Sequence, residues 1–155
     1  MRGDLATADL MVFAKDYPEV RLVVEVKRSL SDTRGLDMAI RQVARYMWGA
    51  NCHYGLVFTP ATTYVLRDDF MTQGPESIRV SNTVPTEKLL SRLGTRVTES
   101  SSEQGFELAV RKWLELLATS YESALPDDPE VTKAFFPEIV GAVSEGRVVA
   151  EASFR

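Results

Sequence analysis

The stretch ADLMVFAKDYPEVRLVVEVKR, residues 8–28, determines the fold that the sequence predicts. Residues 21–27 are rich in β-branched side chains and follow a turn that contains Pro18, which is typical of a strand. Residues 9–13 form a second short apolar run, and the turn residues between the two runs favour a hairpin. We therefore expect two antiparallel strands at the start of the chain.

The hairpin brings two carboxylates together. A turn centred on Tyr17 places Asp9 opposite Glu25, with Cβ atoms roughly 5 Å apart on one face of the sheet. Lys27 lies on that face too, because side chains alternate along a strand. Two facing carboxylates are destabilising unless a group of opposite charge lies between them, and a divalent cation with oxygen ligands is the usual solution. The alternative is an exposed Glu25–Lys27 pair on an edge strand, which would contribute little.

Residues 36–47 carry the helical spacing of apolar side chains that should pack on this sheet. Gln42 and Tyr46 are one turn apart on the flank of the apolar stripe, where a helix could present them to a ligand of the hairpin. The alternative leaves Gln42 in solvent and Tyr46 in packing. Arg41 and Arg45 form a similar pair further round the helix, towards solvent.

The order Asp9, then Glu25-Val26-Lys27, then Gln42-x-x-x-Tyr46 resembles the PD-(D/E)XK nuclease superfamily, within it the RecB-like branch with a Gln-x-x-x-Tyr helix. Residues 54–67 are also similar to the sheet region of the nuclease domain of type I restriction enzymes. The resemblance covers residues 8–68. It implies an α/β fold with a restriction-endonuclease-like mixed β-sheet core flanked by helices.

The resemblance also implies roles for individual residues. The Asp9 and Glu25 carboxylates and the Val26 carbonyl would bind Mg²⁺, with Mn²⁺ as a substitute. Lys27 should stay charged beside two carboxylates, so it would orient water or stabilise charge rather than abstract a proton. Asp9, Glu25 and Lys27 are thus the expected catalytic residues, and the expected substrate-binding residues are Gln42, Tyr46, Arg28 and Arg45.

The N-terminus departs from the superfamily pattern. Such domains usually begin with a helix, often with a further Glu, and a strand before the Asp, whereas eight residues precede Asp9. Three explanations are open. The chain could be a shortened piece, later segments could supply the missing elements, or the site could be degenerate.

The remaining residues predict a mainly helical C-terminal half. Residues 1–94 are expected to form the α/β core, and residues 95–155 a helical extension that ends in a strand and packs on the core as one domain. Residues 95–102 are the best linker candidate, and Ser101 with Gln104 suggests a capping box that opens the next helix. The expected strands are 54–59, 62–67, 78–80 and 147–154, and the expected helices are 85–93, about 15 residues from Ser101, and 130–144 with a break at Pro137.

Composition narrows the class of protein. The 155 residues are 45% hydrophobic and 26% charged, which suits one globular domain. The single cysteine, Cys52, excludes an internal disulfide framework, and a lone Cys with a lone His excludes a thiolate zinc site. No apolar run is long enough for a membrane span, and residues 1–20 do not resemble a signal peptide. We expect a cytoplasmic protein without a membrane partner.

Charge is distributed unevenly along the chain. The net charge of −4 argues against a protein that coats nucleic acid through bulk charge. Residues 20–50 nevertheless carry a net charge of +3, whereas residues 99–155 carry −6. The positive part coincides with the expected site, as binding of DNA phosphates would require.

The sequence therefore predicts a Mg²⁺-dependent deoxyribonuclease of restriction, defence or repair type, with DNA as its partner. Two alternatives remain. One is a non-catalytic nucleic-acid-binding or regulatory module on the same fold. The other is a structural subunit of a homodimer or larger complex, whose acidic C-terminal half buries an apolar helix face against another chain.

Overall fold

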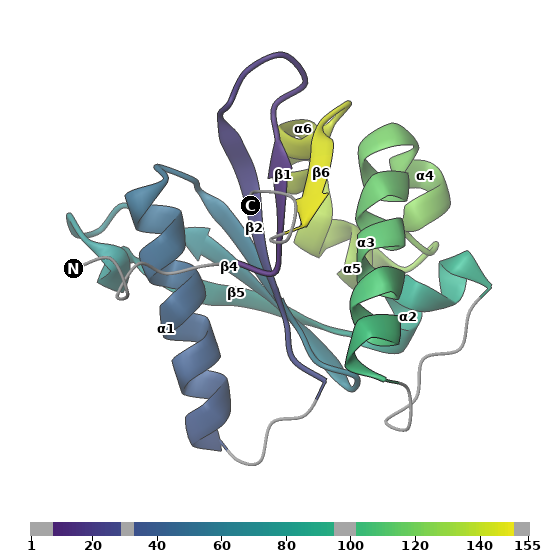
Figure 1. The fold of residues 1–155 in the computed structure, drawn as a ribbon, viewed down its shortest axis with the longest axis horizontal. Coiled ribbons are helices and arrows are strands. Elements are labelled where there is room, and N and C mark those ends of the chain that lie inside the picture. The colour runs from purple at the N-terminus through teal and green to yellow at the C-terminus, as the bar shows by residue number, and fades with distance from the viewer. Residues whose placement is uncertain (1–7, 29–32, 95–101, 151–155) are drawn as a thin grey trace.

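A six-stranded mixed sheet with helices on both faces forms the protein (Figure 1). The computed structural model describes residues 8–28, 33–94 and 102–150. The strand order is β5-β4-β3-β2-β1-β6, so the N-terminal and C-terminal strands lie next to each other. The strands are β1 (Leu10–Phe13), β2 (Val20–Val26), β3 (Tyr54–Phe58), β4 (Thr62–Asp68), β5 (Ile78–Pro85) and β6 (Arg147–Ala150).

The β1–β2 hairpin has the predicted register. Leu10 pairs with Val24 and Met11 with Val23. The same register, continued by one residue, places Asp9 opposite Glu25. A bulge shifts the register at Phe13, close to the turn. The hairpin prediction is confirmed, and both strands bury apolar side chains on both faces of the sheet.

Helix α1 (Thr33–Gly49) connects β2 to β3, which pair in parallel as predicted. Its buried residues are Ala39, Val43, Ala44 and Met47, which pack on one face of the sheet. The helix lies so close to β3 that a Cβ on Gly55 would be 2.6 Å from Met47 Sδ. Glycine is required at this position because any side chain would collide with α1.

The remaining helices cover the opposite face (Figure 1). The centre of that core is Trp113, whose ring lies edge-on to Phe58 on β3 at 5.6 Å and to Phe135 at 5.5 Å. These helical elements are α2 (Thr86–Leu90), the short 3-10 helix η3 (Ser91–Leu93), α3 (Glu103–Thr119), α4 (Tyr121–Ala124), α5 (Pro129–Phe135) and α6 (Glu138–Val143). The other short 3-10 helix, η2 (Pro75–Ser77), packs against α1. Within the described ranges, none of these helices has the length and apolar character needed to cross a bilayer.

Several strands and helices begin or end at other residues than predicted. β5 runs through Pro85 rather than ending at residue 80, because its pairing with β4 extends across the polar residues 81–83. Helix α3 is capped by Ser102, whose Oγ accepts from the Gly105 backbone, whereas the predicted cap Ser101 lies outside the described residues. Most of the predicted linker, residues 95–101, and the end of the last strand, residues 151–154, also lie outside them.

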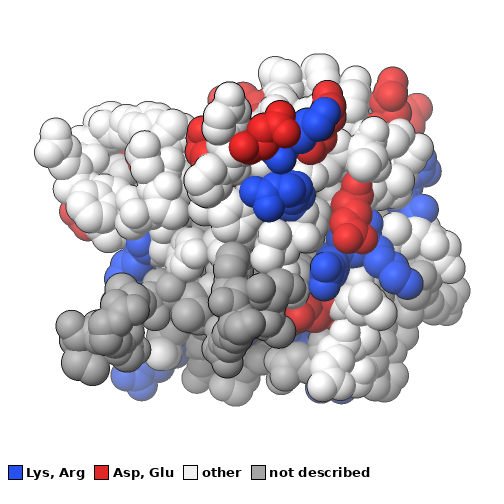
Figure 2. All heavy atoms as spheres, turned by 45° about the horizontal axis from the view of Figure 1, so that its top comes forward, with Lys and Arg blue, Asp and Glu red and all other residues white. Residues whose placement is uncertain are grey.

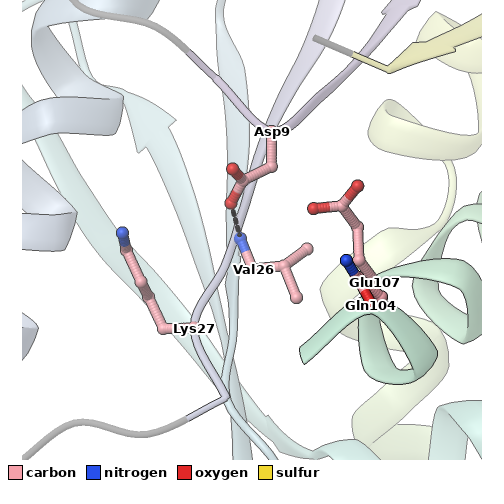
Figure 3. Close-up of a pocket in the computed structure, with 5 residues that line it drawn as sticks. All are labelled: Asp9, Val26, Lys27, Gln104 and Glu107. Carbon is pink, nitrogen blue, oxygen red and sulfur yellow. Dashed lines mark hydrogen bonds between the residues drawn. The ribbon is translucent and has the colours of Figure 1, made fainter. Parts of the chain in front are cut away.

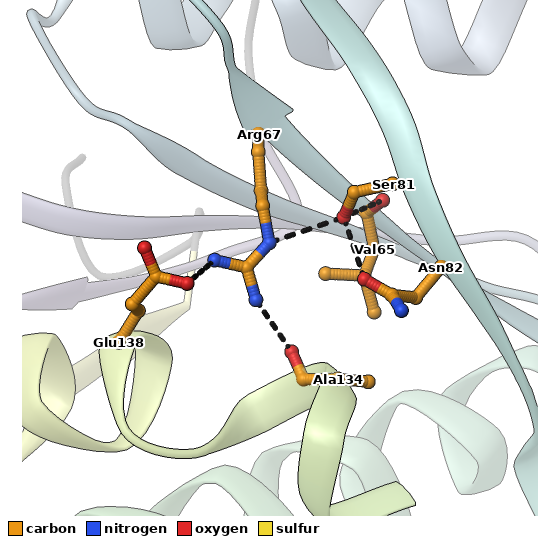
Figure 4. Close-up of polar contacts among 6 residues, drawn as sticks. All are labelled: Val65, Arg67, Ser81, Asn82, Ala134 and Glu138. Atoms are coloured by element: carbon orange, nitrogen blue, oxygen red, sulfur yellow. Dashed lines mark hydrogen bonds and ion pairs between the residues drawn. The ribbon is translucent and has the colours of Figure 1, made fainter. Parts of the chain in front are cut away.

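Arg67 ties the sheet to the C-terminal helices (Figure 4). From β4, its guanidinium donates to Ser81 on β5 and to the Ala134 carbonyl of α5, and it pairs with Glu138 at the start of α6. The guanidinium also lies 5.6 Å from the centre of the Tyr54 ring. These contacts fix α5 and α6 on the sheet.

Candidate functional site

Asp9 and Lys27, two of the predicted catalytic residues, lie at the C-terminal end of β2 (Figure 3). Asp9 directly precedes β1, and its Oδ2 accepts a hydrogen bond of 2.7 Å from the Val26 backbone N–H. Lys27 follows β2, and its Nζ lies 3.0 Å from Glu25 Oε2. Asp9, Glu25 and Lys27 are therefore brought together, as predicted from the register.

Glu25 is a buried carboxylate. Its side chain is 3% exposed, whereas that of Lys27 is 34% exposed and reaches solvent. Burial raises the pKa of Glu25 above its usual value, and the nearby Asp9 raises it further, while Lys27 opposes both effects. The ionised form of Glu25 is therefore disfavoured relative to that of an exposed glutamate, although Lys27 and the Asp9 backbone N–H both stabilise it.

A cleft of about 320 Å³ opens at this end of the sheet, lined by Asp9, Val26, Lys27, Gln104 and Glu107. In Figure 3, Asp9 lies between Lys27 on one side and Glu107 of α3 on the other. Gln104 and Glu107 were not among the predicted site residues. The available signal was their position in the first turns of an amphipathic helix, next to the buried Phe106, but nothing local connects that helix to Asp9.

The predicted Mg²⁺ site offers two carboxylates, which is the smallest donor set that a hard cation commonly uses. Asp9 and Glu25 supply carboxylate oxygens, and one oxygen of each already has a partner in Val26 N–H or Lys27. Within residues 8–28, 33–94 and 102–150, no three His, Cys, Asp or Glu side chains are grouped so that they could hold a metal. Mg²⁺ commonly keeps several waters and takes one or two carboxylates, so this donor set suits Mg²⁺ better than a metal that needs a full protein cage.

The predicted substrate-binding residues lie elsewhere. Gln42 and Arg45 line a second cavity, between α1 and the segment around Pro75. Tyr46 of α1 is half-buried and packs against the core between α1 and the sheet, and burial raises the pKa of its hydroxyl. Arg28 follows Lys27 and is half-buried. The lining of the cleft includes none of these four described residues, and their contact with substrate stays a prediction.

Cys52 does not offer a second chemistry. The thiol is buried, donates to the Tyr54 carbonyl at 3.3 Å, and has its pKa raised to about 11 by burial. A thiol with such a pKa is protonated at neutral pH, and the thiolate is the nucleophilic form. Cys52 therefore acts as a small core residue.

The opposite end of the hairpin has mixed charge. Figure 2 brings this end forward and shows basic and acidic side chains side by side. Lys15 pairs with Glu145 at 3.2 Å, and Arg21 pairs with Glu19 at 3.1 Å. These pairs neutralise one another, so this end provides no continuous basic surface for an anionic partner.

Comparison of the chain with protein-family models, curated proteins and solved structures gave no match. The function must therefore be inferred from the site itself.

Proposed function

We propose that the protein is a metal-dependent nuclease that hydrolyses DNA phosphodiester bonds with Asp9, Glu25 and Lys27. The single observation that carries this proposal is a buried Glu25 whose pKa is raised by burial and by Asp9, and which lies beside two residues that line an open cleft, Asp9 and Lys27. A buried carboxylate beside a second carboxylate lowers the stability of the fold. Carboxylates with perturbed pKa values in clefts are frequent at functional sites.

The proposed roles follow from the contacts. Asp9 accepts a hydrogen bond from the Val26 N–H and lines the cleft, so its carboxylate would be one ligand of a bound cation. Glu25 would be the second carboxylate ligand and the Val26 carbonyl a third oxygen donor. A bound Mg²⁺ would stabilise developing negative charge and lower the pKa of an attacking water.

Lys27 has a different part. Its ammonium is anchored at one side by Glu25 and is partly exposed at the other, so it can contact a phosphate without leaving its partner. It would stabilise charge on the phosphate and position it, as cationic side chains do in phosphoryl transfer. Glu107 lines the other side of the cleft and would interact with waters of a bound cation.

The test is cleavage of end-labelled single-stranded and duplex DNA with Mg²⁺, with Mn²⁺ and with EDTA. The proposal predicts products that depend on the cation and disappear in Glu25→Gln. Glu122→Gln, an exposed carboxylate in the first turn of α4, is the matched control and should cleave normally. Absence of products from the wild-type protein with either cation would overturn the proposal.

One observation favours a second candidate, a non-catalytic nucleic-acid-binding module. The 3.0 Å contact between Lys27 and Glu25 already gives the buried carboxylate a counter-charge. If this pair is purely structural, DNA would bind without being cut, and Glu25→Gln would weaken folding rather than catalysis.

A further inference from the structure

Two cavities lie between α1 and the segment 68–78, and neither is lined by a residue of the candidate catalytic site. Their volumes are about 580 Å³ and about 330 Å³. The first uses the middle of the helix, with Arg41 and Arg45, against Pro75. The second uses its C-terminal end, with Trp48, against Phe70. We call the two cavities together the α1 groove.

The groove has cationic groups in its first part. Arg41 and Arg45 are exposed and one helical turn apart, and neither forms an ion pair within the described part of the chain. Glu76 lines the same cavity, so the positive charge is local and modest. Guanidinium groups bind phosphate through paired hydrogen bonds, which suits two neighbouring arginines to a phosphate backbone.

The second part of the groove presents aromatic rings. Trp48 is 51% exposed and Phe70 is 66% exposed, which is unusual for such large apolar side chains. Phe70 has a φ of 59°, and its backbone N–H donates to Asp68 Oδ1 at 2.8 Å. Its ring is edge-on to His53 at 5.0 Å. A non-glycine residue rarely adopts this backbone conformation, so the fold holds the ring in a fixed, exposed position.

Amide groups complete the second cavity. Asn51 and Gln73 line it beside Trp48 and Phe70 and offer hydrogen-bond donors and acceptors. The Asp68 carboxylate also lines this cavity, and its Oδ1 accepts from the Phe70 N–H and from Ser77 Oγ. Aromatic faces next to amides recognise unstacked bases, which stack on the ring and form hydrogen bonds along their edges. A positively charged track with aromatic platforms is the general solution for binding single strands.

We propose that the α1 groove binds single-stranded nucleic acid, with phosphates on Arg41 and Arg45 and bases on Trp48 and Phe70. Duplex DNA hides its base faces and fits a concave groove poorly, so a single strand is the better occupant. The proposal goes beyond the proposed nuclease function, because this binding requires neither a metal nor cleavage.

The test is fluorescence anisotropy in EDTA with labelled oligothymidylate and oligouridylate, each about a dozen nucleotides long. Each oligonucleotide should bind Glu25→Gln with the same affinity as the wild-type protein. This result would separate the proposal from the nuclease function. The arginine double variant Arg41→Ala/Arg45→Ala should bind at least about tenfold more weakly. The control Lys112→Ala/Lys133→Ala removes the same charge from α3 and α5 and should change affinity less than about twofold. The slope of log affinity against log salt should be near −1.4, for about two phosphate contacts.

Trp48 gives an independent measurement. The chain has two tryptophans, and Trp113 is fully buried, so a bound strand should quench Trp48 fluorescence selectively. Trp48→Ala should weaken binding about fivefold or more, whereas Trp48→Phe should retain most affinity but lose the quenching. Tyr17→Ala, which removes another exposed ring, should bind normally.

Three results would overturn the proposal. The first is absence of binding by the wild-type protein, and the second is equal weakening by the arginine variant and its lysine control. The third is self-association of the wild-type protein in sedimentation that Trp48→Ala abolishes while oligonucleotide affinity is unchanged. That last result would identify the groove as an interface between two copies of the chain.

Discussion

Replacement of Glu25 by Gln should separate a metal site from a structural ion pair. Because the folded protein raises the pKa of Glu25 despite the contact with Lys27, ionisation of this side chain opposes folding. The sign follows from linkage. The stabilising contribution of protonated Glu25 is complete below the usual pKa of 4.5 and is lost as the pH rises through the higher folded-state pKa. At neutral pH without metal, Glu25→Gln should therefore be as stable as the wild-type protein or more stable.

Addition of Mg²⁺ should reverse this order. A ligand at ten times its Kd that binds only the folded state adds about 1.4 kcal/mol of stability. For a domain of this size, that corresponds to a rise in Tm of about 3–6 °C. The wild-type protein should show this rise, and Glu25→Gln should not, because it lacks one of two carboxylate ligands.

Differential scanning fluorimetry at neutral pH, with EDTA and with increasing Mg²⁺, measures both effects on the same samples. Glu122→Gln serves as the control and should follow the wild-type protein under both conditions. A Tm for Glu25→Gln far below that of the wild-type protein in EDTA, or equal Mg²⁺ stabilisation of both proteins, would refute the reasoning and favour a structural Glu25–Lys27 pair.

Three further predictions concern the site and its support. Asp9→Asn should unfold with nearly wild-type free energy because an amide oxygen can still accept from Val26 N–H, whereas Asp9→Ala should lose about 1–3 kcal/mol in urea denaturation. Gly55→Ala should lose about 1–3 kcal/mol in the same assay, since the new Cβ would overlap Met47, and an unchanged midpoint would contradict the close packing of α1. At subsaturating Mg²⁺, cleavage rates should fall as Glu25 of the metal-free protein becomes protonated, at a pH above the 4.5 of an ordinary glutamate.

The sequence predicted the elements whose signals are local. The β1–β2 register follows from a turn centred on Tyr17, and Leu10 does pair with Val24. The parallel β2–α1–β3 unit follows from the length of the connection and the apolar stripe of the helix. The break at Pro137 follows from the missing backbone donor, and α5 ends just before it.

The features that the sequence did not predict depend on contacts between distant parts of the chain. β5 carries exposed polar residues, so only its pairing with β4 shows that it continues to Pro85. Glu107 enters the cleft because α3 packs on the face of the sheet opposite α1, and periodicity alone does not show where a helix docks. The burial of Glu25 was also not predictable, because the sequence of β2 does not show which segments cover the face on which Glu25 lies.

The most direct test of the central claim is single-turnover cleavage of labelled DNA by wild-type protein, Glu25→Gln, Lys27→Ala and Glu122→Gln in Mg²⁺. The account predicts cleavage by the wild-type protein and by Glu122→Gln, and a loss of at least about a hundredfold in the other two. Equal cleavage by all four proteins, or cleavage that persists in EDTA, would show that the hydrolysis does not arise from the Asp9, Glu25 and Lys27 site.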